Sequence, residues 1–447
     1  MEQDGTHKKN KTVLKNGRIV TMNPAGDVVQ ADLFIHSGKI AKIGKISETD
    51  ADVIDCSGLL ILPGFVQMHV HLCQTLFRGR ADDLELLDWL QKRVWPYEAA
   101  LDAEAMRASA RLGIAELIKG GTTCILDMGS VRHYDVVFDE LAQSGLRAFG
   151  GKCMMDHPET VPDTLRENCD ESLAESEWLG QTWDGYDHQR LRYAVTPRFA
   201  ISCTDELLID SSKLARDHGY LLHTHSSENR DEMSLIARRA GCGNVEFLHR
   251  LGLTGPDVIL AHCIWLNSAE KRLMEETHTG EAHCPSSNLK LASGIAPVYD
   301  YLQHGVRVGL GADGAPCNNN LDMFVEMRLA ALLQKARFGA SALKAKDVLR
   351  MATHGGAEAL NLGDHIGSLE VGKKADIIGI LDETVSTVPM NDPYSQLVYA
   401  SSSRDVMFNM VDGRLLMRNR DLLSVDEQQT IALAKSEIKR VLDRMQA

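Results

Sequence analysis

The 447-residue sequence predicts an α/β protein: a closed (β/α)₈ TIM barrel with a composite β-sandwich formed by both chain ends. Three observations predict this fold. Short apolar, β-rich runs alternate with longer helical patterns through the middle of the chain, as in parallel βα units. There are eight such runs, the number that closes a barrel. Short strands with tight turns precede and follow this region, which places β structure at both ends of the chain.

Residues 1–62 are assigned to the N-terminal part of the sandwich. They contain the β-rich runs TVLKNGRIVTM, ADLFIHSGKIAKIGKI and DVIDCSGLLIL. Asn-Gly, Ser-Gly and the segment from Pro24 to Gly26 interrupt these runs, and such residues favour tight turns.

The barrel is expected over residues 63–364. Its eight apolar runs span 63–71, 122–129, 147–156, 191–199, 219–228, 258–266, 280–288 and 307–314. Helical patterns lie between the runs, at 103–119, 134–144, 205–217, 231–250 and 268–277. The last of them has Asn267 or Ser268 as its N-cap. In such a barrel the active residues come from the C-terminal ends of the strands.

Residues 365–447 are expected to complete the sandwich and to add a final helix. The runs KKADIIGILD and VMFNMVDGRLLMRNR predict strands, and the second is a hairpin that turns at Asp412-Gly413. Ser424 and Glu427 match a capping box for a helix over 425–445.

The composition restricts the classes of partner. With 48 Lys+Arg against 62 Asp+Glu, the net charge of −14 argues against binding nucleic acid or an anionic membrane surface. No apolar run approaches the ~20 residues of a membrane span, and the polar start MEQDGTHKKNK lacks the apolar core of a signal peptide. The ten cysteines are scattered without CxxC spacing, which is typical of reduced thiols. We expect a cytoplasmic protein.

Four of the predicted strand ends carry residues suited to metal binding or proton transfer. His69 and His71 alternate on the first strand, and positions i and i+2 face the same side, so both imidazoles aim into the barrel mouth. Any one such residue alone is as readily a hydrogen-bonded core residue. Convergence on one face of one barrel is what indicates a site. The other strand ends contribute His223, His225, Glu228, His262 and Asp313.

The order PGFVQMHVH, HTHSSE, LAHC and GLGADGAPCNNN resembles the amidohydrolase superfamily, in its cytosine/adenine/guanine-deaminase-like branch. The runs CPSSNLKLASGIAPV and GADGAPCNNNLDMFVEMRLAALLQK are similar to the methylthioadenosine / S-adenosylhomocysteine deaminase group, especially to 5′-deoxyadenosine deaminases. The resemblance extends from LKNGRIVTM to MVDGRLL. It implies the barrel with its composite β-sandwich, and a homo-oligomer.

The resemblance also implies a role for each site residue. His262 would lie beside a bound water, and Glu228 would carry that water's proton to a ring nitrogen of the substrate. Asp313 would help to protonate the departing ammonia. His223 would not be a ligand, and we expect it to face inward behind the site. The implied ligands of one divalent metal per chain are His69, His71, His225 and Asp313.

A single metal is expected because one feature of binuclear relatives is missing. Those relatives bridge two metals with a carboxylated lysine, usually at strand four. Here strand four ends Thr196-Pro197-Arg198, and Lys152 lies on strand three. Three histidines, one carboxylate and a water indicate zinc, and iron would accept the same ligands.

Trp89, Glu98 and Arg198 occupy positions where the family's substrate contacts fall, and Glu228 and Asp313 would also touch the substrate. Trp89 would cover a nucleoside or serve as a core residue. Glu98 would accept hydrogen bonds from two ribose hydroxyls, or lie on the surface near a helix start. Arg198 ends strand four, where an exposed arginine is more often functional than structural.

The resulting prediction is a metal-dependent hydrolytic deaminase that converts the adenine amine of a 5′-modified adenosine to the inosine analogue and releases ammonia. The candidate purine nucleosides are 5′-deoxyadenosine, 5′-methylthioadenosine, S-adenosylhomocysteine and adenosine. The alternative is a deaminase or dechlorinase of another N-heterocycle, such as guanine, a pterin or an s-triazine. A non-catalytic scaffold is disfavoured, because such proteins typically lose metal ligands. The sequence leaves open the 5′ substituent, the choice between zinc and iron, and the oligomer size.

Overall fold

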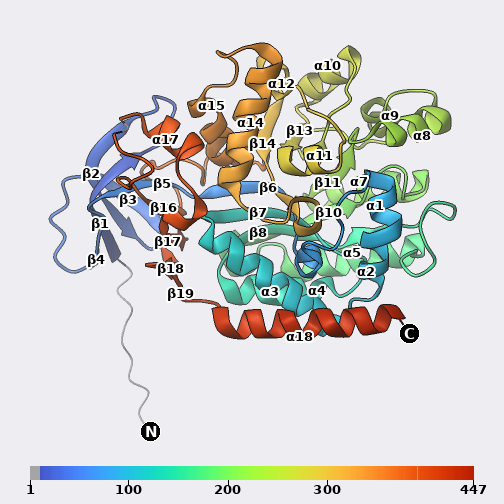
Figure 1. Cartoon of the computed structure of the whole chain (residues 1–447), viewed down its shortest axis with the longest axis horizontal. Coiled ribbons are helices and arrows are strands. Elements are labelled where there is room, and N and C mark those ends of the chain that lie inside the picture. The colour runs from blue at the N-terminus through green and yellow to red at the C-terminus, as the bar shows by residue number, and fades with distance from the viewer. Residues whose placement is uncertain (1–10, 390, 447) are drawn as a thin grey trace, which may run out of the picture.

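The fold is described from a computed structural model, which covers residues 11–389 and 391–446. Figure 1 shows a smaller β domain beside a larger barrel, with the C-terminal helix running along the barrel's lower edge. The start of the predicted 1–62 segment, including the polar N-terminus, lies outside the described residues. Within the described part, no helix combines the length and apolar composition that crossing a bilayer requires.

Eight parallel strands close into the predicted barrel, each within one of the eight apolar runs. Neighbouring strands pair in chain order, the last pairs with the first, and a pairing between β10 and β11 completes the ring. The strands are β6 (Phe65–His71), β7 (Thr122–Met128), β8 (Arg147–Gly151), β10 (Leu191–Pro197), β11 (Leu221–Ser226), β12 (Val258–His262), β13 (Gly280–His283) and β14 (Arg307–Leu310). Two short strands, β9 (Cys153–Met154) and β15 (Asp313–Gly314), pair with β10 and β6.

The barrel interior is packed, so a site can lie only at its open end. One apolar cluster includes Met68, Leu126, Ile259 and Ala282 from four different strands. Leu360, which directly follows the short helix α16 (Gly356–Ala359), packs into the same cluster near the N-terminal ends of the strands. The C-terminal strand ends are therefore the ones left free for a site.

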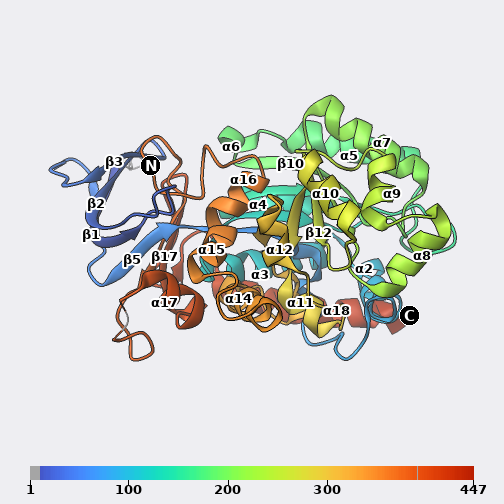
Figure 2. The ribbon, with the colours of Figure 1, turned by 90° about the horizontal axis from the view of Figure 1, so that it is seen from above.

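Helices surround the barrel (Figure 2). The longer ones are α3 (Ala103–Lys119), α4 (Tyr134–Ser144), α5 (Cys169–Trp183), α7 (Asp205–His218), α8 (Arg230–Ala240), α9 (Asn244–Arg250), α10 (Ser268–Thr277), α14 (Met323–Phe338) and α18 (Glu427–Gln446). The shorter ones are η1 (Leu72–Phe77), α1 (Leu86–Trp89), η2 (Leu90–Val94), α2 (Trp95–Ala99), α6 (Tyr186–Gln189), α11 (Pro285–Lys290), α12 (Val298–Gln303), α13 (Ala315–Asn318), α15 (Ala345–Arg350), η3 (Met351–Gly355), α17 (Pro393–Tyr399) and η4 (Ser403–Asp405).

The structure corrects one predicted helix and decides between two proposed N-caps of another. The single helix expected over 231–250 is two helices, because Gly241 takes a left-handed conformation (φ +68°) and ends α8. Of the two N-caps proposed for α10, Asn267 is the one observed, and its side chain accepts hydrogen bonds from the amides of Ala269 and Glu270.

The strands of both chain ends form one domain, as predicted. Their hydrogen bonds join them into a single nine-stranded mixed sheet, in which β5 pairs with β16. One apolar cluster, which includes Leu33, Ile61 and Phe408, draws on both ends. The domain boundaries at 62/63 and 364/365 stay predictions. The strands are β1 (Lys11–Val20), β2 (Val28–His36), β3 (Lys39–Gly44), β4 (Asp52–Asp55), β5 (Leu59–Pro63), β16 (Ile377–Leu381), β17 (Val406–Val411), β18 (Arg414–Arg418) and β19 (Asp421–Leu422).

Turn chemistry explains two features of this sheet. Asp412 and Gly413 both have positive φ (48° and 73°) between β17 and β18, which is the geometry of the predicted two-residue hairpin. Asn16-Gly17 makes no turn: it lies within β1, where the register with β2 shifts, and forms a bulge.

The final helix begins later than the capping box suggests. Helix α18 starts at Glu427, and the Asp426 carboxylate accepts a hydrogen bond from the Gln429 amide at 2.9 Å. The Ser424 hydroxyl makes no hydrogen bond, so the proposed Ser424–Glu427 box is wrong. Asp426 provides the cap because its side chain lies one residue before the first turn.

Candidate metal and catalytic site

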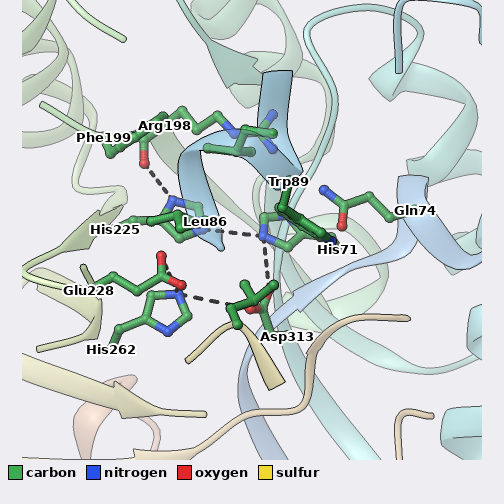
Figure 3. Close-up of a pocket in the computed structure, with 12 residues that line it drawn as sticks. His71, Gln74, Leu86, Trp89, Arg198, Phe199, His225, Glu228, His262 and Asp313 are labelled. Carbon is green, nitrogen blue, oxygen red and sulfur yellow. Dashed lines mark hydrogen bonds and ion pairs between the residues drawn. The ribbon is translucent and has the colours of Figure 1, made fainter. Parts of the chain in front are cut away.

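Four buried side chains converge at the C-terminal mouth of the barrel. Strand β6 supplies His69 and His71, β11 supplies His225, and β15 supplies Asp313. Their ligand-type atoms all lie within 4.8 Å of one another. The Nε2 atoms of His71 and His225 are 3.3 Å apart, and Asp313 Oδ1 is 3.2 Å from His71 Nε2 and 3.3 Å from His69 Nε2. Figure 3 shows His71, His225 and Asp313 pointing toward one another.

Close packing of backbone beside β6 supports this cluster. A Cβ atom at Gly311, between β14 and β15, would lie 2.7 Å from the carbonyl oxygen of His69 and 2.8 Å from its nitrogen. Only glycine permits that approach, so the residue that brings the Asp313 strand against β6 has no side chain.

The rings of His71 and His225 are oriented so that the lone pairs of their Nε2 atoms face each other. Their Nδ1 atoms lie 2.7 Å from the Met128 carbonyl oxygen and 2.6 Å from the Arg198 carbonyl oxygen. A carbonyl only accepts, so each Nδ1 carries the proton and each neutral ring keeps its Nε2 lone pair free. Two lone pairs 3.3 Å apart repel each other unless a cation lies between them. Three imidazole nitrogens and one carboxylate oxygen form a donor set that fits zinc.

Asp313 remains ionised despite its burial. Burial alone raises the pKa of a carboxyl group, but the neighbouring His69 and His71 rings hold the pKa of Asp313 well below its usual range. The Ser287 hydroxyl donates to Oδ2 at 2.6 Å. Asp313 has a φ of +60°, and His262 a φ of +75°. Both are rare for residues other than glycine, and such strain is concentrated at functional sites.

Glu228 and His262 lie directly beside the four-residue cluster. His262 Nε2 is 3.5 Å from Glu228 Oε2 and 3.9 Å from Asp313 Oδ2, and its Nδ1 donates to the Asn288 amide oxygen at 2.9 Å. Burial, followed by the charges of Asp313 and Glu232, raises the pKa of Glu228 well above its usual range. A carboxyl group in this environment can hold a proton near neutral pH and release it to a bound molecule.

A small pocket, with a cavity volume of about 20 Å³, opens onto these residues. Leu86 and Trp89 of α1 form an apolar part of its wall (Figure 3). Leu90 of η2 also lines the pocket. Trp89 is buried and also lines the pocket, so the core position and the pocket position predicted as alternatives coexist. The pocket-lining residues are His71, Gln74, Leu86, Trp89, Leu90, Arg198, Phe199, His225, Glu228, His262, Leu291 and Asp313.

Glu98 and Arg198 form a buried ion pair at the edge of this pocket. Arg198 Nη1 lies 2.7 Å from Glu98 Oε2, and the Gln74 amide donates to Glu98 Oε1 at 2.8 Å. The surface position considered for Glu98 is therefore wrong, and so is the expectation that Arg198 is exposed, because each is at most 4% accessible. Arg198 lines the pocket, whereas Glu98 lies behind it. A direct contact of Glu98 with ribose stays a prediction.

Three polar residues that support the site were not predicted from the sequence. Ser287 and Asn288 hold Asp313 and His262, and Gln74 holds Glu98. The run Ser286-Ser287-Asn288, which follows the seventh barrel strand after Cys284 and Pro285, was the available signal for the first two. Lys152, by contrast, is engaged away from the histidines, where it pairs with Glu167 and with Glu175 at 2.8 Å.

A closed βα barrel with three histidines and an aspartate at its mouth is the arrangement of a metal-dependent hydrolase. Residues 60–416 match the Amidohydrolase family, and the chain belongs to that family. It is 39% identical over 97% of its length to a 5′-deoxyadenosine deaminase of Methanosarcina acetivorans, covering 99% of that protein. It is 40% identical over 92% of its length to a 5-methylthioadenosine/S-adenosylhomocysteine deaminase of Thermococcus onnurineus, covering 95% of that protein. Among solved structures, an adenosine deaminase from Xanthomonas campestris with bound zinc superposes with a TM-score of 0.91 at 32% identity, over 97% of this chain and 98% of that one.

Proposed function

We propose that the chain is a metal-dependent aminohydrolase acting on a 5′-modified adenosine. Water replaces the amine of the adenine ring, which yields the inosine analogue and ammonia. The candidate substrates are 5′-deoxyadenosine, 5′-methylthioadenosine, S-adenosylhomocysteine and adenosine. Near full-length likeness to deaminases of such nucleosides supports the reaction. The single observation that carries it is the cluster of Glu228, His262 and Asp313 at one wall of the pocket.

One divalent metal per chain, zinc, belongs to this proposal. The chemistry of the donor set and the lone pairs of His71 and His225 that face each other support it, as does the zinc bound by the similar adenosine deaminase. When bound, zinc supplies the Lewis acidity that makes water a nucleophile near neutral pH. The residues proposed to hold it are His69, His71, His225 and Asp313.

The proton path runs through residues of the chain. Glu228 accepts a proton from the attacking water and delivers it to the ring nitrogen beside the carbon that carries the amine. His262, fixed by Asn288, orients the water through Nε2. As the C–O bond forms, Asp313 accepts the second proton of the attacking water. As the C–N bond breaks, Asp313 passes that proton to the departing amine, which leaves as ammonia. Trp89, with Leu86 and Leu90, excludes solvent from the pocket wall.

Ammonia release from a small panel tests the reaction. The panel contains 5′-deoxyadenosine, methylthioadenosine, S-adenosylhomocysteine, adenosine and guanine, each followed under steady-state conditions. We expect turnover of the nucleosides and none of the free base. Turnover of guanine without any nucleoside would overturn the proposal in favour of another N-heterocycle. A homo-oligomer and a cytoplasmic location remain predictions that accompany this function.

A further inference from the structure

His223 is fully buried on β11, two residues before His225, and contacts the metal cluster from behind. Its Nε2 lies 2.7 Å from Nδ1 of His69, and its own Nδ1 lies 2.9 Å from the carbonyl oxygen of Ile259. The two rings therefore form a chain of hydrogen bonds that ends at the backbone of β12.

The chemistry of the partners fixes the direction of this chain. The Ile259 carbonyl can only accept, so Nδ1 of His223 donates to it. Burial among other imidazoles keeps the His223 ring neutral, which leaves its Nε2 as an acceptor. His69 must then donate from Nδ1 to His223. In a neutral His69 ring this leaves Nε2 without a proton, and that atom makes no hydrogen bond and lies 3.3 Å from Asp313 Oδ1.

We propose that His223 is a positioning residue that locks His69 in the Nδ1–H tautomer, aims its Nε2 at the metal, and thereby sets the affinity of the site for zinc. This inference rests on the metal site of the proposed function. The other two histidines of the cluster donate from Nδ1 to backbone carbonyls, of Met128 and Arg198, which no substitution removes. Only for His69, among these three histidines, is the acceptor of the Nδ1 proton a side chain. A substitution of His223 can therefore remove that acceptor and test its role.

The test compares zinc affinity of the metal-free full chain and of three variants. His223→Leu removes the acceptor and roughly keeps the volume. His223→Gln keeps an oxygen that can accept from His69. His283→Leu is the matched control, because His283 is also buried in a barrel strand, β13, two strands away from β11, but neither of its ring nitrogens has a hydrogen-bond partner. Competition with a chromophoric chelator gives the Kd for zinc, and thermal unfolding of the metal-free chains shows that each is folded.

The expected result is a zinc Kd raised about 10–100-fold in His223→Leu, the range found when a residue that orients a metal ligand is lost. His223→Gln recovers most of the affinity, and His283→Leu leaves it unchanged. Unaltered affinity in His223→Leu would overturn the inference. An equal loss in His223→Gln would also overturn it, because packing rather than the hydrogen bond would then be the cause.

A measurement on the unsubstituted chain covers the case in which His223→Leu fails to fold. In the zinc-loaded protein labelled with ¹⁵N-histidine, we expect His69 Nδ1 to carry a slowly exchanging proton. An unprotonated Nδ1 on His69 would exclude the proposed role. Neither measurement uses a substrate. A chain that binds zinc with this tautomer but releases no ammonia would therefore overturn the proposed function and leave the role of His223 standing.

Discussion

At the scale of single residues, the pKa values of two carboxyl groups at the barrel mouth are shifted in opposite directions. Asp313 has its pKa lowered by two histidines, while burial and neighbouring negative charge raise the pKa of Glu228. An ionised carboxylate suits a cation, and a carboxyl group that can hold a proton suits acid–base transfer. Environment, rather than residue type, thus separates the two roles.

Replacement of Glu228 tests its proton-transfer role. Glu228→Gln keeps the size of the side chain but cannot move a proton, so we expect kcat to fall by about 10²–10⁴-fold. Zinc content, measured by elemental analysis, should be unchanged, because Glu228 is not in the ligand cluster. Glu276→Gln on the exposed face of α10 is the control and should keep full turnover. Near-unaltered rates in Glu228→Gln would remove Glu228 from the mechanism.

Asp127 makes stability depend on pH. This buried residue of β7 accepts hydrogen bonds from the Leu72 amide and the Tyr134 hydroxyl, both at 2.7 Å, and burial raises its pKa to about 6. The folded state therefore holds the proton more tightly than the unfolded state does. Its contribution to stability is complete below about pH 4 and is lost as the pH rises toward 6.

The corresponding variant is Asp127→Asn, which cannot ionise. Between pH 4 and 6, its free energy of unfolding should rise relative to that of the unaltered chain by about 3 kcal/mol, the equivalent of a shift of roughly two pKa units. Urea unfolding of the metal-free proteins at several pH values measures the difference. If the free energies of unfolding of the two proteins changed in parallel with pH, the raised pKa of Asp127 would be contradicted.

At the scale of elements, the connection between β6 and α3 forms most of the upper pocket wall. Residues 72–102 contain η1, α1, η2 and α2, and they contribute Gln74, Leu86, Trp89 and Leu90. The same connection supplies Glu98, which anchors Arg198 across the barrel mouth. This segment is therefore fixed to the barrel by the ion pair at one side of the pocket.

Separate and combined substitution of this ion pair can distinguish anchoring from substrate contact. Arg198→Met leaves the charge of the buried Glu98 without an opposite charge, and we expect a loss of about 3–5 kcal/mol in the free energy of unfolding. Adding Glu98→Leu should restore most of that stability. If either Arg198 or Glu98 also touches substrate, KM stays raised in the stable double variant. A KM that returns to its original value would show that the ion pair only anchors the connection.

Elements were predictable from sequence where local pattern and tertiary structure agree. Every barrel strand is an apolar run bounded by polar or turn residues, so its position could be read directly. The break at Gly241 could not be predicted, because the apolar spacing of a helix continues through it. Only the positive φ of Gly241 ends the helix. The histidines proposed as ligands could be predicted from strand alternation and from the family resemblance. Gln74 and Asn288 act on Glu98 and His262, partners far away in the chain, which spacing does not reveal.

At the scale of the whole molecule, one buried cation joins the barrel to the β domain. Arg147 on β8 lies 2.7 Å from Asp376 and 2.8 Å from Asp412. Both aspartates belong to the C-terminal part of the β domain. The Asn409 side chain of β17 adds hydrogen bonds to the carbonyls of Ile118 and Thr122. The two domains are thus connected by satisfied polar groups as well as by apolar packing.

Removal of this cation should destabilise the chain without altering the site. Arg147→Met leaves the buried Asp376 unpaired, and we expect about 3–5 kcal/mol of lost unfolding free energy, measured by urea denaturation. Arg418→Met, at an exposed position on β18, should change stability by no more than about 0.5 kcal/mol. A loss below about 1 kcal/mol in Arg147→Met would show that the joint contributes little.

The pairing of β5 with β16 also governs how the protein is made. Strand β5 leaves the ribosome early, but its partner at Ile377–Leu381 follows only after the entire barrel has been translated. At about 5–20 residues per second, the interval is roughly 15–60 s. During that time the nascent chain carries an open strand edge, which can recruit a β-strand from another polypeptide. Until its own C-terminus arrives, the N-terminal sheet is therefore exposed to pairing with other chains.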